Sequence, residues 1–453
     1  MTMRVTPIKH FDEAYESALD ALRVLVQEEI IQRAVLIPDL YARIRVIVWL
    51  LDKVQVTDEV HKQVAERLAA AAGLFWSGDV WLAPGETRAD REMFEGTWEE
   101  STSVTPEIHL DERYRSMGVW LRLPLEPPWQ TDDSAEEYGS PIVTFYSFRG
   151  GVGRTTALAA FALQRANRGE RVAVVDLDLE APGLGALLST EEGISARWGV
   201  VDYLLEQPLL NNVDLRDYYH LANPRLTGAG QVFVIPAGHF DMHYLPKLAR
   251  VDFSPPPESA PGGCTEPHPL ECLLRHLRDE FRPHWVLLDS RTGLSEVAGF
   301  VLGGFAHLNV LFGTTAESSW QGLHYAVQRL GAERVQRGIL QAECLLVQAM
   351  VSDNPEVARV AENAFDLRAE DEFREFYYAE DPEDAQAPEE DRFWYIRDME
   401  SRDAPHVPIP LYYTQRLAFF TSTERVKDIL LTSPDYLRLG ERIASRFTGS
   451  QER

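Results

Sequence analysis

Short apolar runs alternate with longer amphipathic segments through the last two-thirds of the chain. The segments that carry these runs lie at 142–146, 171–180, 231–238, 285–288, 307–315 and 344–348. Such runs are typical of parallel strands that are covered on both faces. Helical segments begin near Thr155 and Leu270, each between two of the runs. The alternation predicts an α/β fold with a mostly parallel, doubly wound sheet over residues 141–453.

The first 125 residues follow a different pattern. Helical spacing of apolar residues covers 11–32, a strand-like run covers 43–49, and a second helix begins at Thr57 and ends before Gly73. This pattern predicts a small α+β N-terminal domain over residues 1–125. The proline-rich, acidic stretch 126–140 then reads as a linker.

Three tryptophans of the N-terminal region, Trp76, Trp81 and Trp98, allow two interpretations. They can form a face that binds a partner, or they can belong to the core. Aromatic clusters are more often core than interface, so the core is favoured.

The composition narrows the function classes. The chain has 453 residues, 45% of them hydrophobic, and a formal net charge of −27. A strongly acidic surface repels a polyanion, so nucleic acid is disfavoured as a partner. Three cysteines form no C-x-x-C pair, and no apolar stretch approaches the roughly 20 residues of a membrane span. We therefore expect a cytoplasmic protein without a zinc site or a disulfide framework.

A glycine-rich turn separates the apolar run 142–146 from the alanine-rich helix near Thr155. Glycines let backbone N–H groups turn inward around an anion, and the helix N-terminus adds its partial positive charge. Phe148 stands where the standard phosphate loop has its first glycine, and Arg154 stands where that loop has lysine. The turn predicts a phosphate-binding loop made by Gly150, Gly151, Val152, Gly153, Arg154, Thr155 and Thr156.

This loop resembles the deviant Walker A sequence K-G-G-x-G-K-T-T of the ParA/MinD/ArsA-like P-loop ATPases (SIMIBI class). Both lysines are changed to arginine, Arg149 and Arg154, as in the KGGVGR-motif variant. The resemblance implies ATP and Mg²⁺ as ligands. It also implies that Arg149 crosses a two-fold interface to the nucleotide of a second copy; the alternative is an arginine satisfied within its own subunit.

Further blocks follow in the order that the family has. The D-x-D run implies that Asp178 positions the attacking water and that Asp176 lies near the outer shell of the metal. The sequence 289–293 is similar to the family's D-S-P-A-G, so Asp289 should hold Mg²⁺ through water and the Gly293 amide should sense the γ-phosphate. Arg291 departs from the pattern, and is either a phosphate clamp or part of a salt bridge.

Charge chemistry agrees with these roles without the family. Phosphoryl transfer needs neutralised phosphate oxygens, a metal and an oriented water. The Thr155 hydroxyl can bind Mg²⁺, while Arg154 and the loop amides can neutralise phosphate. A guanidinium is bulkier than the ammonium that it replaces, so turnover is expected to be slow.

The base-binding residues are less well marked. The end of the run 344–348 carries Gln348 where the resembled ATPases usually have an asparagine for adenine, and Pro408 lies in a segment that resembles the loop closing over the base. No N-K-x-D guanine signature follows, which favours ATP over GTP.

Two other segments each leave two interpretations. The acidic insertion 364–391 is either a solvated run or a docking surface for a basic partner. The segment 433–447 has apolar residues at helical spacing between arginines, which fits a closing helix on the sheet or, less often, a membrane anchor.

These observations predict a Mg²⁺-dependent ATPase that acts as a nucleotide-controlled dimerisation switch. The N-terminal domain or the acidic insertion would report the state to a protein partner. The alternative is a nucleotide-sensing module of a bacterial signalling or conflict system with weak or no hydrolysis.

Overall fold

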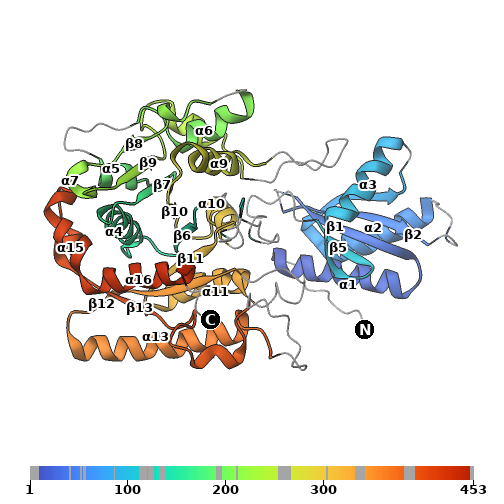
Figure 1. The fold of residues 1–453 in the computed structure, drawn as a ribbon. Coiled ribbons are helices and arrows are strands. Elements are labelled where there is room, and N and C mark those ends of the chain that lie inside the picture. The colour runs from blue at the N-terminus through green and yellow to red at the C-terminus, as the bar shows by residue number, and fades with distance from the viewer. Residues whose placement is uncertain are drawn as a thin grey trace. The chain divides into compact units, whose positions relative to one another are not determined.

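Two separate sheets organise the chain, one in each of two compact units, Met1–Leu121 and Arg122–Arg453 (Figure 1). The computed structural model describes residues 10–39, 42–51, 54, 58–85, 87–111, 120, 127–129, 131, 139–189, 196–210, 213–253, 267–302, 305–331, 342–381 and 393–448.

The first unit holds a five-stranded sheet of order β3-β2-β1-β5-β4. Its strands are β1 (Ile31–Pro38), β2 (Ile44–Leu50), β3 (Trp76–Ala83), β4 (Thr102–Thr105) and β5 (Ile108–Leu110). Its helices are α1 (Phe11–Gln27), α2 (Asp58–Ala72) and α3 (Arg88–Glu100). Parallel and antiparallel pairs alternate in this sheet, so the predicted small α+β domain is confirmed.

The first predicted helix is five residues too long. Helix α1 ends at Gln27, Glu29 takes a left-handed backbone with φ of 55°, and β1 begins at Ile31. The residues after Ile31 include a buried apolar run in the middle of the sheet, and burial of that run decides for a strand.

The three tryptophans do not form one cluster. Trp76 packs with the α1 and α2 side of the sheet. Trp81 and Trp98 pack on the opposite face around Phe94 of α3. All three are half-buried, so they belong to the edges of two cores.

The second unit holds an eight-stranded sheet of order β13-β12-β11-β6-β10-β7-β9-β8. Its strands are β6 (Ile142–Ser147), β7 (Arg171–Leu177), β8 (His220–Leu221), β9 (Gln231–Ile235), β10 (Trp285–Ser290), β11 (Leu308–Gly313), β12 (Cys344–Val351) and β13 (Ile409–Tyr412). All neighbours pair in parallel except β8 with β9. The predicted mostly parallel, doubly wound sheet is confirmed.

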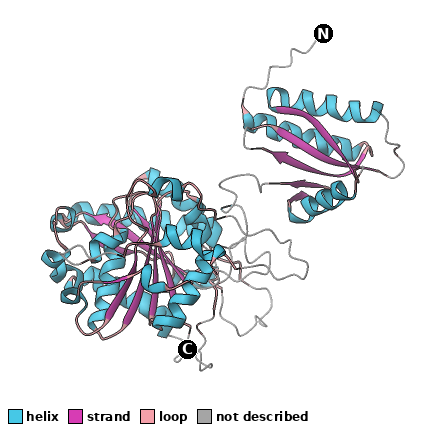
Figure 2. Cartoon of the chain, turned by 90° about the horizontal axis from the view of Figure 1, so that it is seen from above, coloured by secondary structure: helices cyan, strands magenta, loops and turns pink. Residues whose placement is uncertain are grey.

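Helices cover both faces of this sheet (Figure 2). One face carries α4 (Arg154–Asn167), α5 (Leu184–Leu188), α7 (Pro224–Thr227), α15 (Lys427–Thr432) and α16 (Pro434–Thr448). The other carries α6 (Val200–Glu206), α8 (Tyr244–Leu248), α9 (Pro269–Phe281), α10 (Glu296–Val301), α11 (Glu317–Leu330) and α13 (Pro355–Phe376). A short helix α14 (Gln415–Ala418) precedes α15.

Helix α16 closes the sheet, as one of the two interpretations of this segment expected. Tyr436, Leu439 and Ile443 are buried in the core that α4 shares. Its apolar side is therefore covered by protein. Within the part of the chain that the structure describes, no helix has both the length and the apolar character needed to cross a bilayer.

The acidic insertion begins inside regular structure rather than in a separate segment. Residues 364–376 are the second half of α13, where Phe365, Ala369 and Phe373 are buried. Asp366, Asp371 and Glu375 take exposed positions of this amphipathic helix, whereas Glu372 is buried. The interpretation as a wholly solvated run is wrong for this half, and 382–391 lie outside the described residues.

Most of the predicted linker also lies outside the described residues, but Trp129 within it is buried. Its indole Nε1 donates to the Ser140 carbonyl oxygen at 2.7 Å. The segment next to the second unit is thus anchored to that unit's core.

Candidate functional site

The glycine loop, residues 148–153, joins β6 to the N-terminus of α4. Gly151 and Gly153 have φ of 76° and 85°, a conformation that side chains with a Cβ rarely adopt. A Cβ placed on Gly150, Gly151 or Gly153 would meet nothing within 4 Å. The loop therefore borders open space in front of a 14-residue helix, which is the arrangement that binds anions.

Three aspartates lie beside this loop. Asp176 and Asp289 stand opposite each other on the paired strands β7 and β10, and Asp178 follows two residues after Asp176. All three are less than a tenth exposed. Parallel strands bring their carboxyl ends to one edge of a sheet, and this explains why side chains so distant in sequence meet here.

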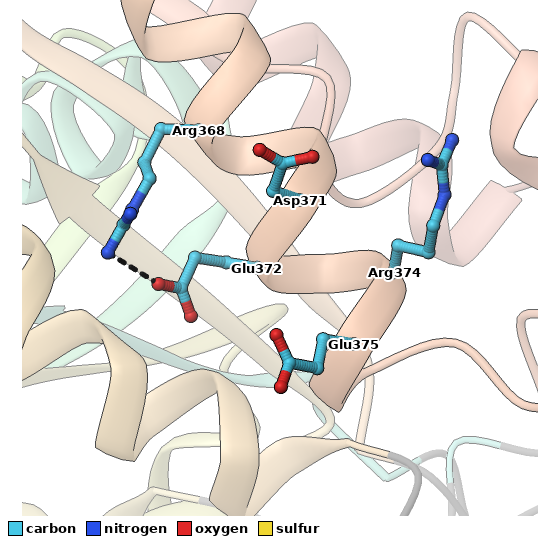
Figure 3. Close-up of a pocket in the computed structure, with 5 residues that line it drawn as sticks. All are labelled: Arg368, Asp371, Glu372, Arg374 and Glu375. Atoms are coloured by element: carbon cyan, nitrogen blue, oxygen red, sulfur yellow. Dashed lines mark ion pairs between the residues drawn. The ribbon is translucent and has the colours of Figure 1, made fainter.

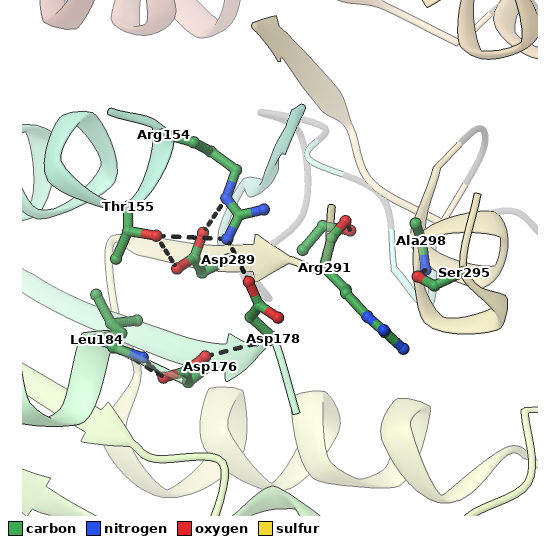
Figure 4. A network of polar contacts seen from close by, with 11 residues as sticks. Arg154, Thr155, Asp176, Asp178, Leu184, Asp289, Arg291, Ser295 and Ala298 are labelled. Atoms are coloured by element: carbon green, nitrogen blue, oxygen red, sulfur yellow. Dashed lines mark hydrogen bonds and ion pairs between the residues drawn. The ribbon is translucent and has the colours of Figure 1, made fainter. Parts of the chain in front are cut away.

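Arg154 is directed into these carboxylates (Figure 4). Its Nε donates to Asp289 Oδ1 at 2.7 Å and its Nη2 to Asp178 Oδ2 at 3.0 Å. The side chain is 5% exposed. The third nitrogen, Nη1, is buried and has no hydrogen-bond partner among the residues that the structure describes. One donor of a buried guanidinium is therefore available to a ligand.

Thr155 completes the contact between the loop and β10. Its Oγ1 donates to Asp289 Oδ2 at 2.6 Å. Two of the three residues predicted for the metal site, Thr155 and Asp289, are thus adjacent, and both offer oxygen atoms, which Mg²⁺ prefers. Among the described residues, no group of three or more His, Cys, Asp or Glu side chains is arranged to hold a metal ion. The donor set fits a metal that arrives with ligands of its own.

Burial and mutual charge shift the titration of this cluster. Burial, reinforced by the charge of Asp289, raises the pKa of Asp176 to about 7, although the backbone N–H groups of Leu184 and Asp178 donate to it. Burial also raises the pKa of Asp289 against the opposing effect of Arg154. For Arg154, burial lowers the pKa, but Asp289 and Asp178 outweigh it and raise the value overall. The guanidinium stays charged.

Gly293 lies close to the loop, as predicted. Its φ is 74°, its N–H donates to the Ser147 carbonyl oxygen at 3.3 Å, and its own carbonyl accepts from the Tyr146 hydroxyl at 3.2 Å. The amide that was predicted to sense a γ-phosphate is engaged by the backbone of β6 in this structure.

Arg291 makes a bidentate contact with Glu180, which follows the D-x-D run. The structure therefore has the salt bridge that was one of its two interpretations. Glu180 was not identified as a site residue, although it belongs to the same strand-end run as Asp178.

Arg149 donates from Nη1 to Ser318 Oγ at the start of α11. Within one copy it has this partner, which matches the alternative interpretation of Arg149. Ser318 carries no sequence signal, because it lies 169 residues away.

Gln348 and Pro408 lie near the β13 edge of the large sheet. Gln348 is buried at the end of the β12 ladder, opposite Gly313 on β11 and Pro410 on β13. Pro408 is half-buried directly before β13. Their contact with a base stays a prediction.

A hollow with a volume of about 530 Å³ lies on α13, apart from the glycine loop (Figure 3). It is lined by Arg368, Asp371, Glu372, Arg374 and Glu375. Arg368 pairs with Glu372 at 2.9 Å and Arg374 with Glu370 at 2.6 Å. Its arginines are thus already neutralised by neighbours on the same helix.

No protein-family model matches the sequence, and no curated protein is significantly similar to it. Solved structures to which the chain is similar include ParA and MinD ATPases. The chain is 14% identical to pNOB8 ParA bound to nonspecific DNA, over 69% of this chain and 100% of that one, with a TM-score of 0.43. The chain is 18% identical to the cell division ATPase MinD of Pyrococcus furiosus, over 49% of this chain and 79% of that one, with a TM-score of 0.33. It is 13% identical to a putative plasmid partition protein of Borrelia burgdorferi bound to AMPPNP, over 68% of this chain and 98% of that one, with a TM-score of 0.39.

Proposed function

We propose that the chain binds ATP with Mg²⁺ and hydrolyses it slowly, and that the nucleotide controls the pairing of two copies. The observation that carries this proposal is the juxtaposition of the open glycine loop, the unpaired Nη1 of Arg154 and the carboxylates of β7 and β10. A triphosphate needs hydrogen-bond donors to its phosphate oxygens on one side and a metal-binding carboxylate on the other, and this edge of the sheet offers both.

The chain's own residues divide the work. Loop amides and Arg154 bind the phosphates, because they are the donors nearest the open space. Thr155 and Asp289 would hold the metal, with Asp176 behind them. Mg²⁺, when bound, supplies the positive charge that offsets the β- and γ-phosphate oxygens. Asp178 orients the attacking water by accepting its proton in a hydrogen bond.

Equilibrium titration with ATP and Mg²⁺ tests the site. The parent should bind, and Arg154→Ala should lose most of the affinity, because the fixed charge aimed at the phosphates is removed. Glu180→Gln is the matched control, since it changes a charge at the same edge outside the loop. Equal ATP affinity in the parent and Arg154→Ala would reject the phosphate-loop assignment.

The dimerisation switch depends on Arg149. This side chain lies on the exposed surface of the loop, and its partner among the described residues is a serine hydroxyl, so a phosphate of a second copy would offer it a stronger, charge-assisted contact. In an Asp178→Ala background, ATP should produce dimers and ADP monomers in sedimentation. Adding Arg149→Ala should abolish the ATP-induced dimer while each copy still binds nucleotide. A persisting ATP-dependent dimer would exclude the role in trans.

A second candidate function is a nucleotide-sensing module with little turnover. The ion pair between Arg154 and Asp178 favours it, because the residue proposed to orient water is held by the residue proposed to bind phosphate. A multiple-turnover phosphate-release assay separates the two. Release of many phosphates per protein supports the ATPase, and binding without release supports the sensor.

The proposed protein partner would bind one of two surfaces. Acidic residues on α13 and beyond would suit a basic partner in the cytoplasm, and the N-terminal unit is the other candidate surface. The net charge of −27 argues against nucleic acid as that partner.

A further inference from the structure

Arg154 takes the place that a divalent cation would need. Its guanidinium lies between Asp178 and Asp289 and donates to both, and the Arg154 side chain is only 5% exposed. The hydroxyl of Thr155 is also engaged by Asp289. Both oxygens of the Asp289 carboxylate are therefore engaged, one by the guanidinium and the other by the Thr155 hydroxyl.

This pairing has an electrostatic reason. Buried carboxylates are costly without a counter-charge, and removal of the partner of such a pair is strongly destabilising. Three aspartates lie here, and Arg154 is the arginine that pairs with two of them. A lysine at this position would offer one ammonium and could not bridge two carboxylates in a planar fork. The change of the loop lysine to arginine thus gives the carboxylates a cation of their own.

We propose that Arg154 is the resident counter-ion of the carboxylates and that only a metal–nucleotide complex displaces it. This inference rests on the proposed function and specifies its ligand. Free metal would leave the displaced guanidinium without an anion. Free nucleotide would bring several negative charges to a pocket that already has more carboxylates than cations. The complex would satisfy both sides, because its phosphates would accept from the guanidinium while Asp289 and Thr155 would hold its metal.

The unpaired Nη1 supports this exchange. Two nitrogens of the guanidinium are satisfied by carboxylates, but the third points away from them without a partner (Figure 4). A buried donor without a partner costs free energy. An incoming phosphate oxygen would satisfy this donor before the ion pairs have to break.

Binding of Mn²⁺, followed by electron paramagnetic resonance in place of Mg²⁺, tests the inference in nucleotide-free protein. The parent should show only the weak surface binding expected of an acidic protein. Arg154→Ala should gain one site with an affinity at least about tenfold above that background, because Asp178 and Asp289 are released. Arg154→Ala/Asp289→Asn should lose the gained site. With ATP present, the parent itself should retain one Mn²⁺.

Arg291→Ala is the matched control. It removes an arginine from the same edge, but that arginine pairs with Glu180 and not with Asp178 or Asp289, so Mn²⁺ binding should stay at the parent level. Should Arg154→Ala fail to fold, Arg154→Lys keeps a charge and still frees one carboxylate, and it should gain part of the Mn²⁺ affinity.

The inference is overturned if nucleotide-free parent and Arg154→Ala bind Mn²⁺ equally, or if the parent already holds one tight Mn²⁺. These outcomes are distinct from failure of the proposed function. If the parent binds no ATP in the presence of metal, the function falls, while the Mn²⁺ comparison in nucleotide-free protein still decides the role of Arg154.

Discussion

The Phe148 ring lies directly on Gly322 of α11. A Cβ built on Gly322 would come within 1.8 Å of Phe148 Cγ and within 2.0 and 2.4 Å of its two Cδ atoms. Phe148 occupies the loop position where a standard phosphate loop has glycine. The chain accommodates this large residue because α11 has no side chain where the ring packs.

Gly322→Ala should therefore destabilise the protein. Alanine normally stabilises a helix relative to glycine, but here the methyl group would push the ring and the glycine loop with it. We expect a loss of about 1–3 kcal/mol in the free energy of unfolding and weaker ATP binding. Denaturant titration and ATP titration measure the two effects.

Gly96→Ala is the control for this substitution. Gly96 also lies in a helix, α3, but a Cβ there would meet nothing within 4 Å, so stability should stay equal or rise by roughly 0.5–1 kcal/mol. In a Phe148→Ala background, Gly322→Ala should cost much less than in the parent. An equal cost in both backgrounds would show that the Phe148 ring is not the cause.

Acid should weaken the second unit through His307. Its Nδ1 accepts from the Ile142 N–H at 2.9 Å, and its Nε2 lies 2.9 Å from the Trp129 carbonyl oxygen. Burial lowers the pKa of His307 from 6.5 to about 4. The unfolded chain therefore binds the proton first, so the contribution of the neutral ring is complete above pH 6.5 and is lost as the pH falls toward 4.

This loss should reach at most about 3 kcal/mol. His307→Gln should reduce the loss of stability between these pH values without abolishing it, because burial also lowers the pKa of His220 to about 4, whereas substitution of the exposed His239 by Gln should leave the curve unchanged. Denaturant melts at several pH values measure the slope. An equal pH dependence of stability in the parent and in His307→Gln would contradict the assignment.

Asp178→Asn should separate binding from hydrolysis. Loss of the carboxylate frees Arg154 from one ion pair, so ATP affinity should be equal to or higher than that of the parent. Phosphate release should slow by about a hundredfold, in the range of a removed proton acceptor. Turnover equal to that of the parent would remove Asp178 from the mechanism.

Arg291→Ala should change little. Its partner Glu180 has a side chain that is 49% exposed, and Arg291 is itself 31% exposed. Exposed ion pairs contribute no more than about 1 kcal/mol, and we expect ATP affinity within about threefold of the parent, well below what loss of a charged phosphate contact would cost. A tenfold loss of ATP affinity would instead favour the phosphate-clamp interpretation.

The sequence by itself determined the large sheet and the position of its loop. Apolar runs covered on both faces, a glycine-rich turn before a helix, and aspartates at strand ends are local signals that each reflect burial or backbone geometry over a few residues. The family resemblance implied that Asp176, Asp178 and Asp289 serve one site, and the structure brings them together beside the loop because parallel strands end at one edge. The prediction of a solvated run was wrong for the acidic half of α13, because its charged residues outnumber the few apolar residues through which it packs on the core.

Only the tertiary structure decided which partner each long side chain has. Arg154 contacts Asp289, 135 residues away, and Arg149 contacts Ser318, 169 residues away. The Phe148 ring packs on Gly322 of α11. Local patterns specify backbone conformation and the buried side of an element. The choice among several nearby anions for one guanidinium depends on distances and desolvation that exist only after the strands and helices have packed.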